Sequence, residues 1–162
     1  EVKQQGAGFR VDGEDFDLLK LRTMVVDADT KLAEYLDANP ECKQEWTHKQ
    51  KLKNDPRVTR TGRFLRKTSL DELPQLWNVL RGDMSLVGPR PMMPEQRVLY
   101  PGTDYYDLRP GVTGLWQISD RNEGSFSGRA KFDASYNASM SAGADVLILM
   151  ATVAVVLRGT GH

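Results

Sequence analysis

Three prolines and one glycine fall within seven positions of the stretch GPRPMMP, residues 88–94. Each proline fixes its own φ, has no backbone N–H and restricts the residue before it, so this stretch cannot continue a helix. We expect a rigid loop in which Arg90, between two prolines, is held in extended backbone and presents its guanidinium with little reorganisation. A rigid surface loop without a binding role explains the stretch equally well.

The length and charge of the chain limit its class. Its 162 residues suit one domain, spanning residues 1–162, and are enough to bury a core. Basic and acidic residues number 22 each, so no overall charge draws the molecule to nucleic acid or to a membrane. A single cysteine, Cys42, cannot form an internal disulfide, which indicates a reducing, cytosol-facing environment.

The longest apolar run is VLILMATVAVVL, twelve residues at positions 146–157. A membrane-spanning helix needs about 20 apolar residues, whereas this run as a helix would be only about 18 Å long. We therefore expect the run either to pack inside the fold or to lie at an interface, and the sequence leaves both interpretations open.

The first half of the chain contains signals for a hairpin and for helices. The sequences FRV and FDLLKLRTMVV, on either side of Asp12-Gly13, predict a β-hairpin over residues 9–26. Helical periodicity follows over residues 27–52 and is interrupted at Pro40. These signals predict a compact, helix-rich α/β (α+β) domain with a small N-terminal sheet.

A further helix is predicted over residues 69–81. Ser69 and Glu72 match the S-x-x-E capping box at its start. Pro74 lies one turn inside, so we expect the first turn to be irregular. On this interpretation the adjacent carboxylates of Asp71 and Glu72 lie at the beginning of a helix.

Residues 49–67 form a basic segment with eight basic residues and one acidic residue. Four of its arginines recur at every third residue, so a helix would place several guanidiniums on one side: Arg57, Arg60, Arg63 and Arg66. A solvated charged face explains the pattern most simply, but arginine also suits bidentate phosphate contacts. One alternative is a non-catalytic adaptor whose basic segment binds anionic lipid. We expect no nucleic-acid partner, because Phe64 is the only aromatic residue in the segment.

The acidic pair directly after the basic segment suits phosphate chemistry. Mg²⁺ is commonly held by one or two carboxylates together with substrate phosphates. One carboxylate can hold the metal while the other attacks phosphorus, and arginines then offset the charge on the phosphoryl oxygens. A second Arg-Pro corner, at Arg109, suggests that two anion contacts converge on one site. Adjacent Asp-Glu pairs are common, so spacing alone indicates this chemistry only weakly.

Residues 55–91, DPRVTRTGRFLRKTSLDELPQLWNVLRGDMSLVGPRP, closely resemble the signature of the bacterial sugar transferases. These are monotopic polyprenyl-phosphate phosphoglycosyl transferases that begin exopolysaccharide and O-antigen repeat units. Further matches are KLRTMVVDAD at residues 20–29 and RPGVTGLWQISDRN at residues 109–122. The likeness covers nearly the whole chain.

The resemblance implies a covalent mechanism. Asp71 would attack the β-phosphate of a UDP-sugar, release UMP and pass the phosphosugar to polyprenyl (undecaprenyl) phosphate. Glu72 would hold Mg²⁺, while Arg66, Arg90 and, less directly, Asp133 would serve as substrate or phosphate contacts. Within the family, sequences with the insertion EWTHKQKLKNDPR, here residues 45–57, are most similar to the galactose- or glucose-1-phosphate transferases of exopolysaccharide synthesis.

The resemblance also implies a location. Family members work at the cytoplasmic face of the bacterial inner membrane through amphipathic interface helices, and a homodimer is left open. They carry an apolar helix before the first strand, whereas this sequence opens with EVKQQGAGFRVDG. We therefore expect the N-terminal membrane anchor to be missing from this catalytic domain.

Overall fold

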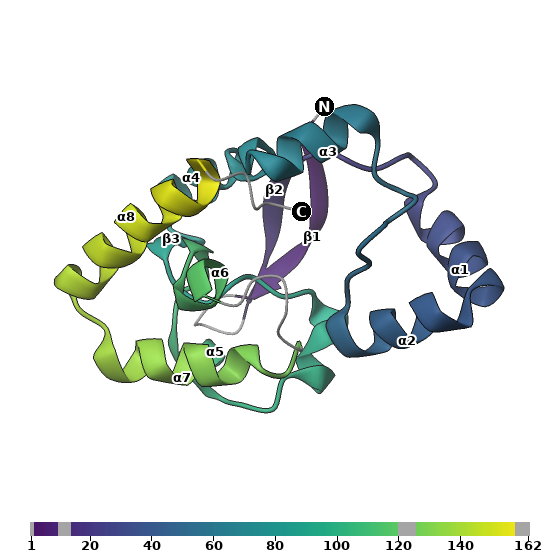
Figure 1. Ribbon diagram of the computed structural model, residues 1–162. Helices are drawn as coiled ribbons and strands as arrows, with labels where there is room; N and C mark the ends of the chain where they lie inside the picture. The colour runs from purple at the N-terminus through teal and green to yellow at the C-terminus, as the bar shows by residue number, and fades with distance from the viewer. Residues whose placement is uncertain (1, 10–13, 120–125, 158–162) are drawn as a thin grey trace.

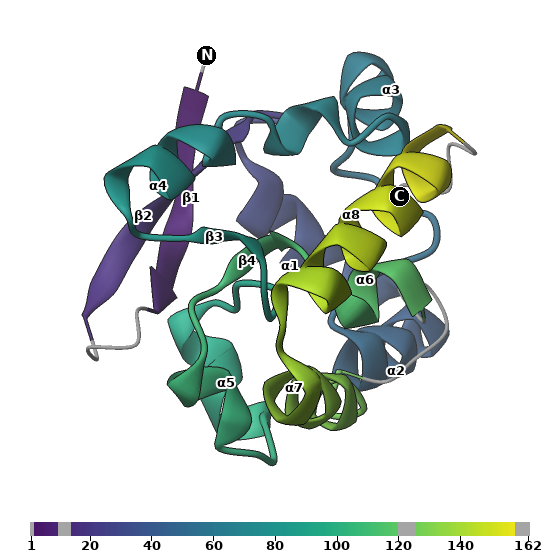
Figure 2. The ribbon, with the colours of Figure 1, turned by 90° about the vertical axis from the view of Figure 1, so that its left-hand side faces the viewer.

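The computed structural model describes residues 2–9, 14–119 and 126–157. Two small sheets are surrounded by helices to different extents: the β1–β2 hairpin lies at one edge of the molecule, whereas β3 and β4 lie nearer its centre (Figure 1 and Figure 2). β1 (Val2–Phe9) pairs antiparallel with β2 (Asp15–Leu21). β3 (Ser85–Val87) pairs in parallel with β4 (Gly111–Thr113). The predicted mixed α/β class, rich in helix, is confirmed.

The predicted N-terminal hairpin is confirmed, but its strands differ from those expected. β1 begins at Val2 rather than near Phe9, and β2 ends at Leu21 rather than at Val26. The stretch VKQQGAGF is rich in glycine and has little β propensity of its own, so backbone pairing with β2 makes it a strand. The expected Asp12-Gly13 turn lies outside the described residues.

The helical pattern over residues 27–52 corresponds to two helices, α1 (Ala28–Ala38) and α2 (Pro40–Lys49). Pro40 is the first residue of α2, a favourable position because its missing N–H would have no helical partner there. The two helices pack against each other and neither contains a buried residue. They form an arm at the right of Figure 1.

The next helix, α3 (Arg60–Lys67), is tied to the chain that follows β2. The Thr59 N–H donates to the Thr23 carbonyl at 3.0 Å. A Cβ atom at Gly62 would lie 1.9 Å from the same carbonyl oxygen, so only glycine fits this approach. The end of β2 and the start of α3 are thereby held side by side.

The four arginines at third-residue spacing do not share one helix face, as the sequence had suggested. Arg60 and Arg63 are exposed on α3. Arg57 lies before the helix and is buried, with its Nη2 atom 2.6 Å from Asp55 Oδ2 and its guanidinium 5.2 Å from the Trp46 ring centroid. Its pairing with a carboxylate two residues away gives Arg57 a structural role.

The predicted helix over residues 69–81 is two separate pieces. A single 3₁₀ turn, η1 (Leu70–Glu72), precedes α4 (Gln75–Arg81). Ser69 has a left-handed φ of 56° and makes no side-chain cap, so the capping-box prediction is wrong. Pro74 has no N–H to donate to the Leu70 carbonyl, which prevents a continuous α-helix. The acidic pair therefore lies on an isolated turn between α3 and α4.

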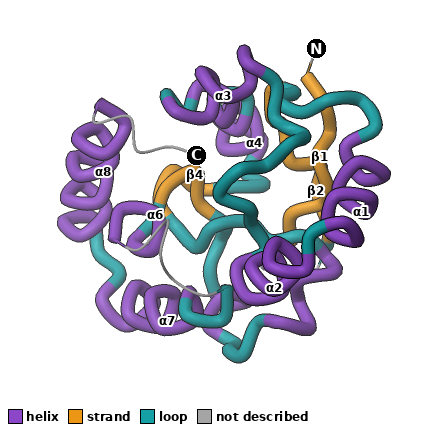
Figure 3. Tube along the Cα trace, turned by 45° about the vertical axis from the view of Figure 1, so that its right-hand side comes forward, coloured by secondary structure: helices purple, strands orange, loops and turns teal. Residues whose placement is uncertain are grey.

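The remaining elements complete the shell around β3 and β4. These are η2 (Pro94–Leu99), α5 (Asp104–Asp107), α6 (Leu115–Ser119), α7 (Arg129–Ser139) and α8 (Ala142–Leu157). In Figure 3, α6, α7 and α8 lie on the side of β4, whereas α1 lies beyond the β1–β2 hairpin. Helix α2 approaches the segment before α7, where the Phe126 N–H donates to the His48 carbonyl at 3.3 Å. Two buried clusters hold this half together, one of Val87, Leu108, Tyr136 and Ile148, the other of Met92, Tyr100, Tyr105 and Phe126.

The twelve-residue apolar run forms most of α8 and packs inside the fold along one side only. Ile148 is buried against the cluster around Val87. The opposite side is exposed to solvent, including Leu147, Met150 and Val153. No helix within the described ranges is long and apolar enough to cross a membrane.

Candidate active site

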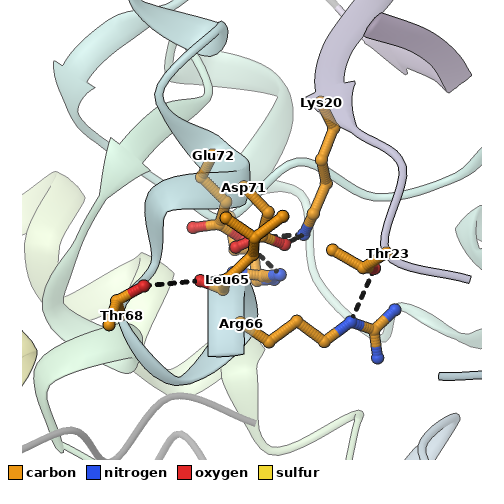
Figure 4. A network of polar contacts seen from close by, with 8 residues as sticks. Lys20, Thr23, Leu65, Arg66, Thr68, Asp71 and Glu72 are labelled. Carbon is orange, nitrogen blue, oxygen red and sulfur yellow. Dashed lines mark hydrogen bonds and ion pairs between the residues drawn. The ribbon is translucent and has the colours of Figure 1, made fainter. Parts of the chain in front are cut away.

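The acidic pair lies at the meeting point of three elements. Asp71 and Glu72, on η1, are only 2% and 9% exposed. The Lys20 ammonium, from β2, lies 3.0 Å from Asp71 Oδ2 and 3.1 Å from Glu72 Oε1 (Figure 4). Arg90, from the loop after β3, places its Nη2 atom 3.0 Å from the same Glu72 oxygen. Two buried carboxylates thus meet two cations.

The buried side-chain amide of Asn78 holds β2 next to α4, the helix that follows the acidic pair. Asn78 of α4 is fully buried. Its Oδ1 accepts from the Leu19 N–H at 3.1 Å, and its Nδ2 donates to the Asp17 carbonyl at 2.9 Å. These two bonds fix α4 to the β2 backbone at Asp17 and Leu19. The next residue of the strand, Lys20, therefore lies close enough to contact η1.

Arg66 flanks the acidic pair from α3. Its Nε donates to Thr23 Oγ1 at 2.9 Å, and Figure 4 shows the side chain directed toward that residue. Burial lowers the pKa of the Arg66 guanidinium, and the carboxylate of Asp71 acts in the opposite direction. The predicted proximity of Arg66 to the pair is therefore present, although Arg66 makes no ion pair with a carboxylate among the described residues.

The two carboxylates are held differently. Glu72 Oε1 accepts hydrogen bonds from both Lys20 and Arg90. Asp71 Oδ2 is buried and forms an ion pair with the Lys20 ammonium at 3.0 Å, and no hydrogen bond to this oxygen is found among the described residues. Asp71 therefore has fewer polar partners than Glu72, and a carboxylate held beside cations is suited to attack an electrophile such as phosphorus.

The other two predicted site residues lie away from the pair. The backbones of the two Arg-Pro corners do meet, since a Cβ at Gly88 would lie 2.2 Å from the Arg109 carbonyl oxygen. The Arg109 side chain, however, is exposed and is not among the cations that contact Asp71 or Glu72. Its role in anion binding remains a prediction.

Asp133 is buried on α7 behind the Arg90 loop. Its Oδ2 accepts from the Tyr100 hydroxyl at 2.9 Å. Burial raises the pKa of the Asp133 carboxyl, whereas the Arg129 guanidinium opposes this shift. Any contribution of Asp133 to substrate binding would be indirect, and it too remains a prediction.

Sequence reasoning missed Lys20, the one cation among the described residues that contacts both carboxylates. Nothing local distinguishes this lysine, because it lies in a strand far from the acidic pair in the sequence. A usable signal was its place at the start of the KLRTM match, which was noted without a role for the residue.

The likeness of this chain to known proteins agrees with that geometry. A sequence model described as "Bacterial sugar transferase" matches residues 2–159. The chain belongs to this family. This bacterial sugar transferase is 52% identical over 152 residues to the UDP-galactose-lipid carrier transferase of Erwinia amylovora, covering 93% of the chain and 32% of the relative.

Two further relatives give the same family assignment. The undecaprenyl-phosphate galactose phosphotransferase of Salmonella typhimurium is 49% identical over 92% of the chain and 32% of its own length. The exopolysaccharide production protein ExoY of Rhizobium meliloti is 47% identical over 93% of the chain and 67% of its own length. The chain thus spans about a third of the first two relatives and about two thirds of the third.

Proposed function

We propose that this sugar transferase moves galactose 1-phosphate or glucose 1-phosphate from a UDP-sugar to polyprenyl phosphate, as the first membrane step of exopolysaccharide or O-antigen synthesis. The observation that carries the proposal is the buried pair of Asp71 and Glu72, held by Lys20 and Arg90. The names of the relatives, which include a galactose-lipid carrier transferase and an undecaprenyl-phosphate galactose phosphotransferase, support the class of donor and acceptor.

In the first step, a carboxylate oxygen of Asp71 attacks the β-phosphorus of the donor. The bond from that phosphorus to the oxygen bridging the two phosphates breaks, and UMP leaves with the electron pair. Lys20 and Arg90 are close enough to the pair to offset the negative charge that builds up on the phosphoryl oxygens. The product is a phosphosugar joined to Asp71 as an acyl phosphate.

In the second step, a phosphate oxygen of the lipid acceptor attacks the same phosphorus. The bond to Asp71 breaks and the carboxylate is restored, giving a sugar diphosphate on the polyprenyl chain. A covalent intermediate divides one difficult displacement into two easier ones. UMP can also leave before the lipid enters, so both substrates need not occupy the site together.

Glu72 is the residue proposed to hold Mg²⁺. No group of three or more His, Cys, Asp or Glu side chains within the described ranges could hold an ion alone. Two adjacent carboxylates nevertheless fit Mg²⁺, which commonly takes one or two carboxylates and completes its shell with substrate phosphates and water. When bound, the ion would neutralise charge on the donor diphosphate.

The proposed working place is the cytoplasmic face of the bacterial inner membrane. Helices α4 and α8 both pack against β3 and lie on either side of it (Figure 2). Both helices also carry large apolar side chains that are exposed to solvent, which is typical of a surface that meets lipid or protein: Leu76, Trp77 and Leu80 on α4, and Val146, Leu147, Met150, Val153 and Leu157 on α8. We propose this apolar face as the membrane interface.

The basic segment is proposed to assist docking rather than to act as a separate adaptor. Arg60 and Arg63 are exposed on α3, next in sequence to the exposed aromatic ring of Phe64. Cations beside an apolar side chain suit the boundary of an anionic membrane. The exposed arginines thus support the membrane proposal without replacing the enzymatic one.

Replacement of Asp71 by asparagine tests the mechanism. Incubation with UDP-galactose or UDP-glucose and Mg²⁺ should release UMP from the unmodified protein and leave a hexose-phosphate adduct, seen by intact mass. Asp71→Asn should abolish both signals, because the amide cannot form the acyl phosphate. Asp37→Asn, at an exposed position on α1, is the matched control and should behave normally. Normal turnover by Asp71→Asn would exclude the covalent mechanism.

A further inference from the structure

Arg129, at the beginning of α7, is a buried cation that forms no ion pair within the part of the chain that the structure describes. It is 3% exposed, and it takes part in none of the ion pairs formed among the described residues. Its guanidinium lies 5.0 Å from the Phe126 ring centroid and 5.6 Å from that of Trp116. Burial lowers the pKa of Arg129, and Asp133 on the same helix opposes this. A charge kept in this environment is costly, so it requires an explanation.

The contact made by Arg129 leads to the acidic pair. Its Nη2 donates a hydrogen bond to the backbone carbonyl of Arg90. The side chain of Arg90 in turn donates to Glu72 Oε1 at 3.0 Å. Arg129 therefore touches the loop residue whose guanidinium reaches the proposed donor-phosphate site, although it does not itself contact Asp71 or Glu72.

The loop around Arg90 depends on outside anchors, because Pro89 and Pro91 have no N–H groups with which to form backbone bonds. On one side, the Gly111 N–H donates to the Pro89 carbonyl at 2.8 Å. On the other, the Met92 N–H donates to the Tyr105 hydroxyl at 3.4 Å. Arg129 supplies the anchor between them. A charged donor makes a stronger hydrogen bond than a neutral one, and a planar guanidinium can also stack on aromatic rings.

We propose that Arg129 is a positioning residue that fixes the backbone of Arg90, so that the Arg90 guanidinium is held against Glu72 and the β-phosphate of the donor. The role of Arg90 toward the donor rests on the proposed function. The contact between the two arginines does not.

A double-mutant cycle tests whether Arg129 acts through Arg90. Arg129→Met is made in the unmodified protein and in Arg90→Ala, and UMP release is normalised to the folded fraction. In the unmodified protein, kcat/KM should fall at least about tenfold, the loss expected for a charge-assisted hydrogen bond. In Arg90→Ala, the same change should cost less than about twofold, because residues that act through one another are not additive. Arg129→Lys, which keeps a charged donor, should recover part of the loss.

Other results would overturn the proposal. Equal losses in both backgrounds would indicate a purely structural role, and an Arg129→Met enzyme within about twofold of the unmodified one would indicate no role. If Arg129→Met does not fold, the cycle is run with Arg129→Gln, which removes the charge but keeps a polar side chain, and the same criteria apply. Lys131→Met, on the exposed side of α7, is the matched control and should leave kcat/KM unchanged.

Hydrogen exchange separates failure of this inference from failure of the proposed function, because it needs no turnover. Arg129→Met should speed exchange of the amides in residues 88–93 at least about tenfold while leaving α4 unchanged, as expected for local opening. Unchanged exchange in residues 88–93 would overturn the positioning role even in an active enzyme. Lack of UMP release by the unmodified protein, together with faster exchange in Arg129→Met, would overturn only the proposed function.

Discussion

Lys20 is the residue whose importance depends most on its surroundings. Its ammonium is the only cation that contacts both Asp71 and Glu72 among the described residues. Two buried carboxylates side by side repel each other, and a cation that contacts both of them offsets this repulsion. The lysine is thus expected to support the nucleophile as well as the donor phosphate.

Lys20→Met should slow UMP release by about 10²–10³-fold, the usual cost of removing one preorganised donor from a charge-stabilising site. The change keeps the length of the side chain while removing its charge. Single-turnover UMP release measures the effect. The matched control is Lys43→Met on α2. The Lys43 side chain is mostly exposed, so this change should leave the rate of UMP release unaltered. A rate within a few-fold of normal would remove Lys20 from the proposed site.

Arg90→Ala should weaken the interaction of the enzyme with its UDP-sugar donor by about 1.5–3 kcal/mol, the contribution of a hydrogen bond to a charged group. Loss of the guanidinium also leaves Glu72 with Lys20 as its remaining partner among the site cations considered above. The dependence of initial rate on UDP-sugar concentration gives the measurement. Unchanged kinetics would mean that Arg90 serves only the shape of its loop.

At the scale of elements, the acidic turn depends on how α3 and α4 are fixed to β2. Gly62 lets α3 approach the Thr23 carbonyl, and Asn78 fastens α4 to the β2 backbone. The turn η1 lies between these two attachments, which is why it meets a side chain of β2. The capping-box pattern of Ser69 and Glu72 predicted one helix here, but Pro74 divides residues 69–81 into two elements.

Gly62→Ala should destabilise the fold by about 1–3 kcal/mol, as overpacking usually does. The added methyl group would overlap the Thr23 carbonyl and push α3 away from it. Urea unfolding followed by circular dichroism measures the change. Gly143→Ala on α8 is the matched control, because a Cβ there meets nothing within 4 Å, and it should be neutral or stabilising by up to about 1 kcal/mol. Similar stability of both variants would show that α3 can move aside freely.

At the scale of the whole molecule, the acidic turn and the exposed apolar side chains of α4 and α8 belong to one continuous part of the fold. Helix α4 begins shortly after the turn, and α8 packs on the same strand as α4. An enzyme that takes a water-soluble donor and a lipid acceptor needs its nucleophile close to such a surface. This need explains why the proposed membrane interface would lie close to the acidic turn.

The double change Leu147→Ser and Val153→Ser should reduce binding of the protein to vesicles of bacterial phospholipid by about tenfold or more, because about 25 cal/mol is lost per Å² of apolar area no longer buried. Vesicle flotation measures the bound fraction. UMP release without lipid should be unchanged, since these side chains lie on the outer side of α8. Val98→Ser, at an exposed position on η2, is the matched control. Equal binding by all three proteins would exclude α8 as the interface.

The sequence by itself determined the hairpin, the break between α1 and α2 at Pro40 and the non-helical loop around Arg90, and it put Asp71 and Glu72 side by side in the chain. The first three depend on the local preferences of a few neighbouring residues. Only the tertiary structure decided the true start of β1, the division of residues 69–81, and the separation of Arg109 from the cations that contact Asp71 and Glu72.

The same division applies to the site. Lys20 lies 52 residues before Glu72 in the sequence and reaches it only because β2, α3 and α4 are packed together. Arg129 lies 39 residues after Arg90 and holds its carbonyl across the fold. Contacts at such separations arise from packing rather than from local propensity, so a pattern of neighbouring residues could identify the two carboxylates and Arg90 but not Lys20 or Arg129.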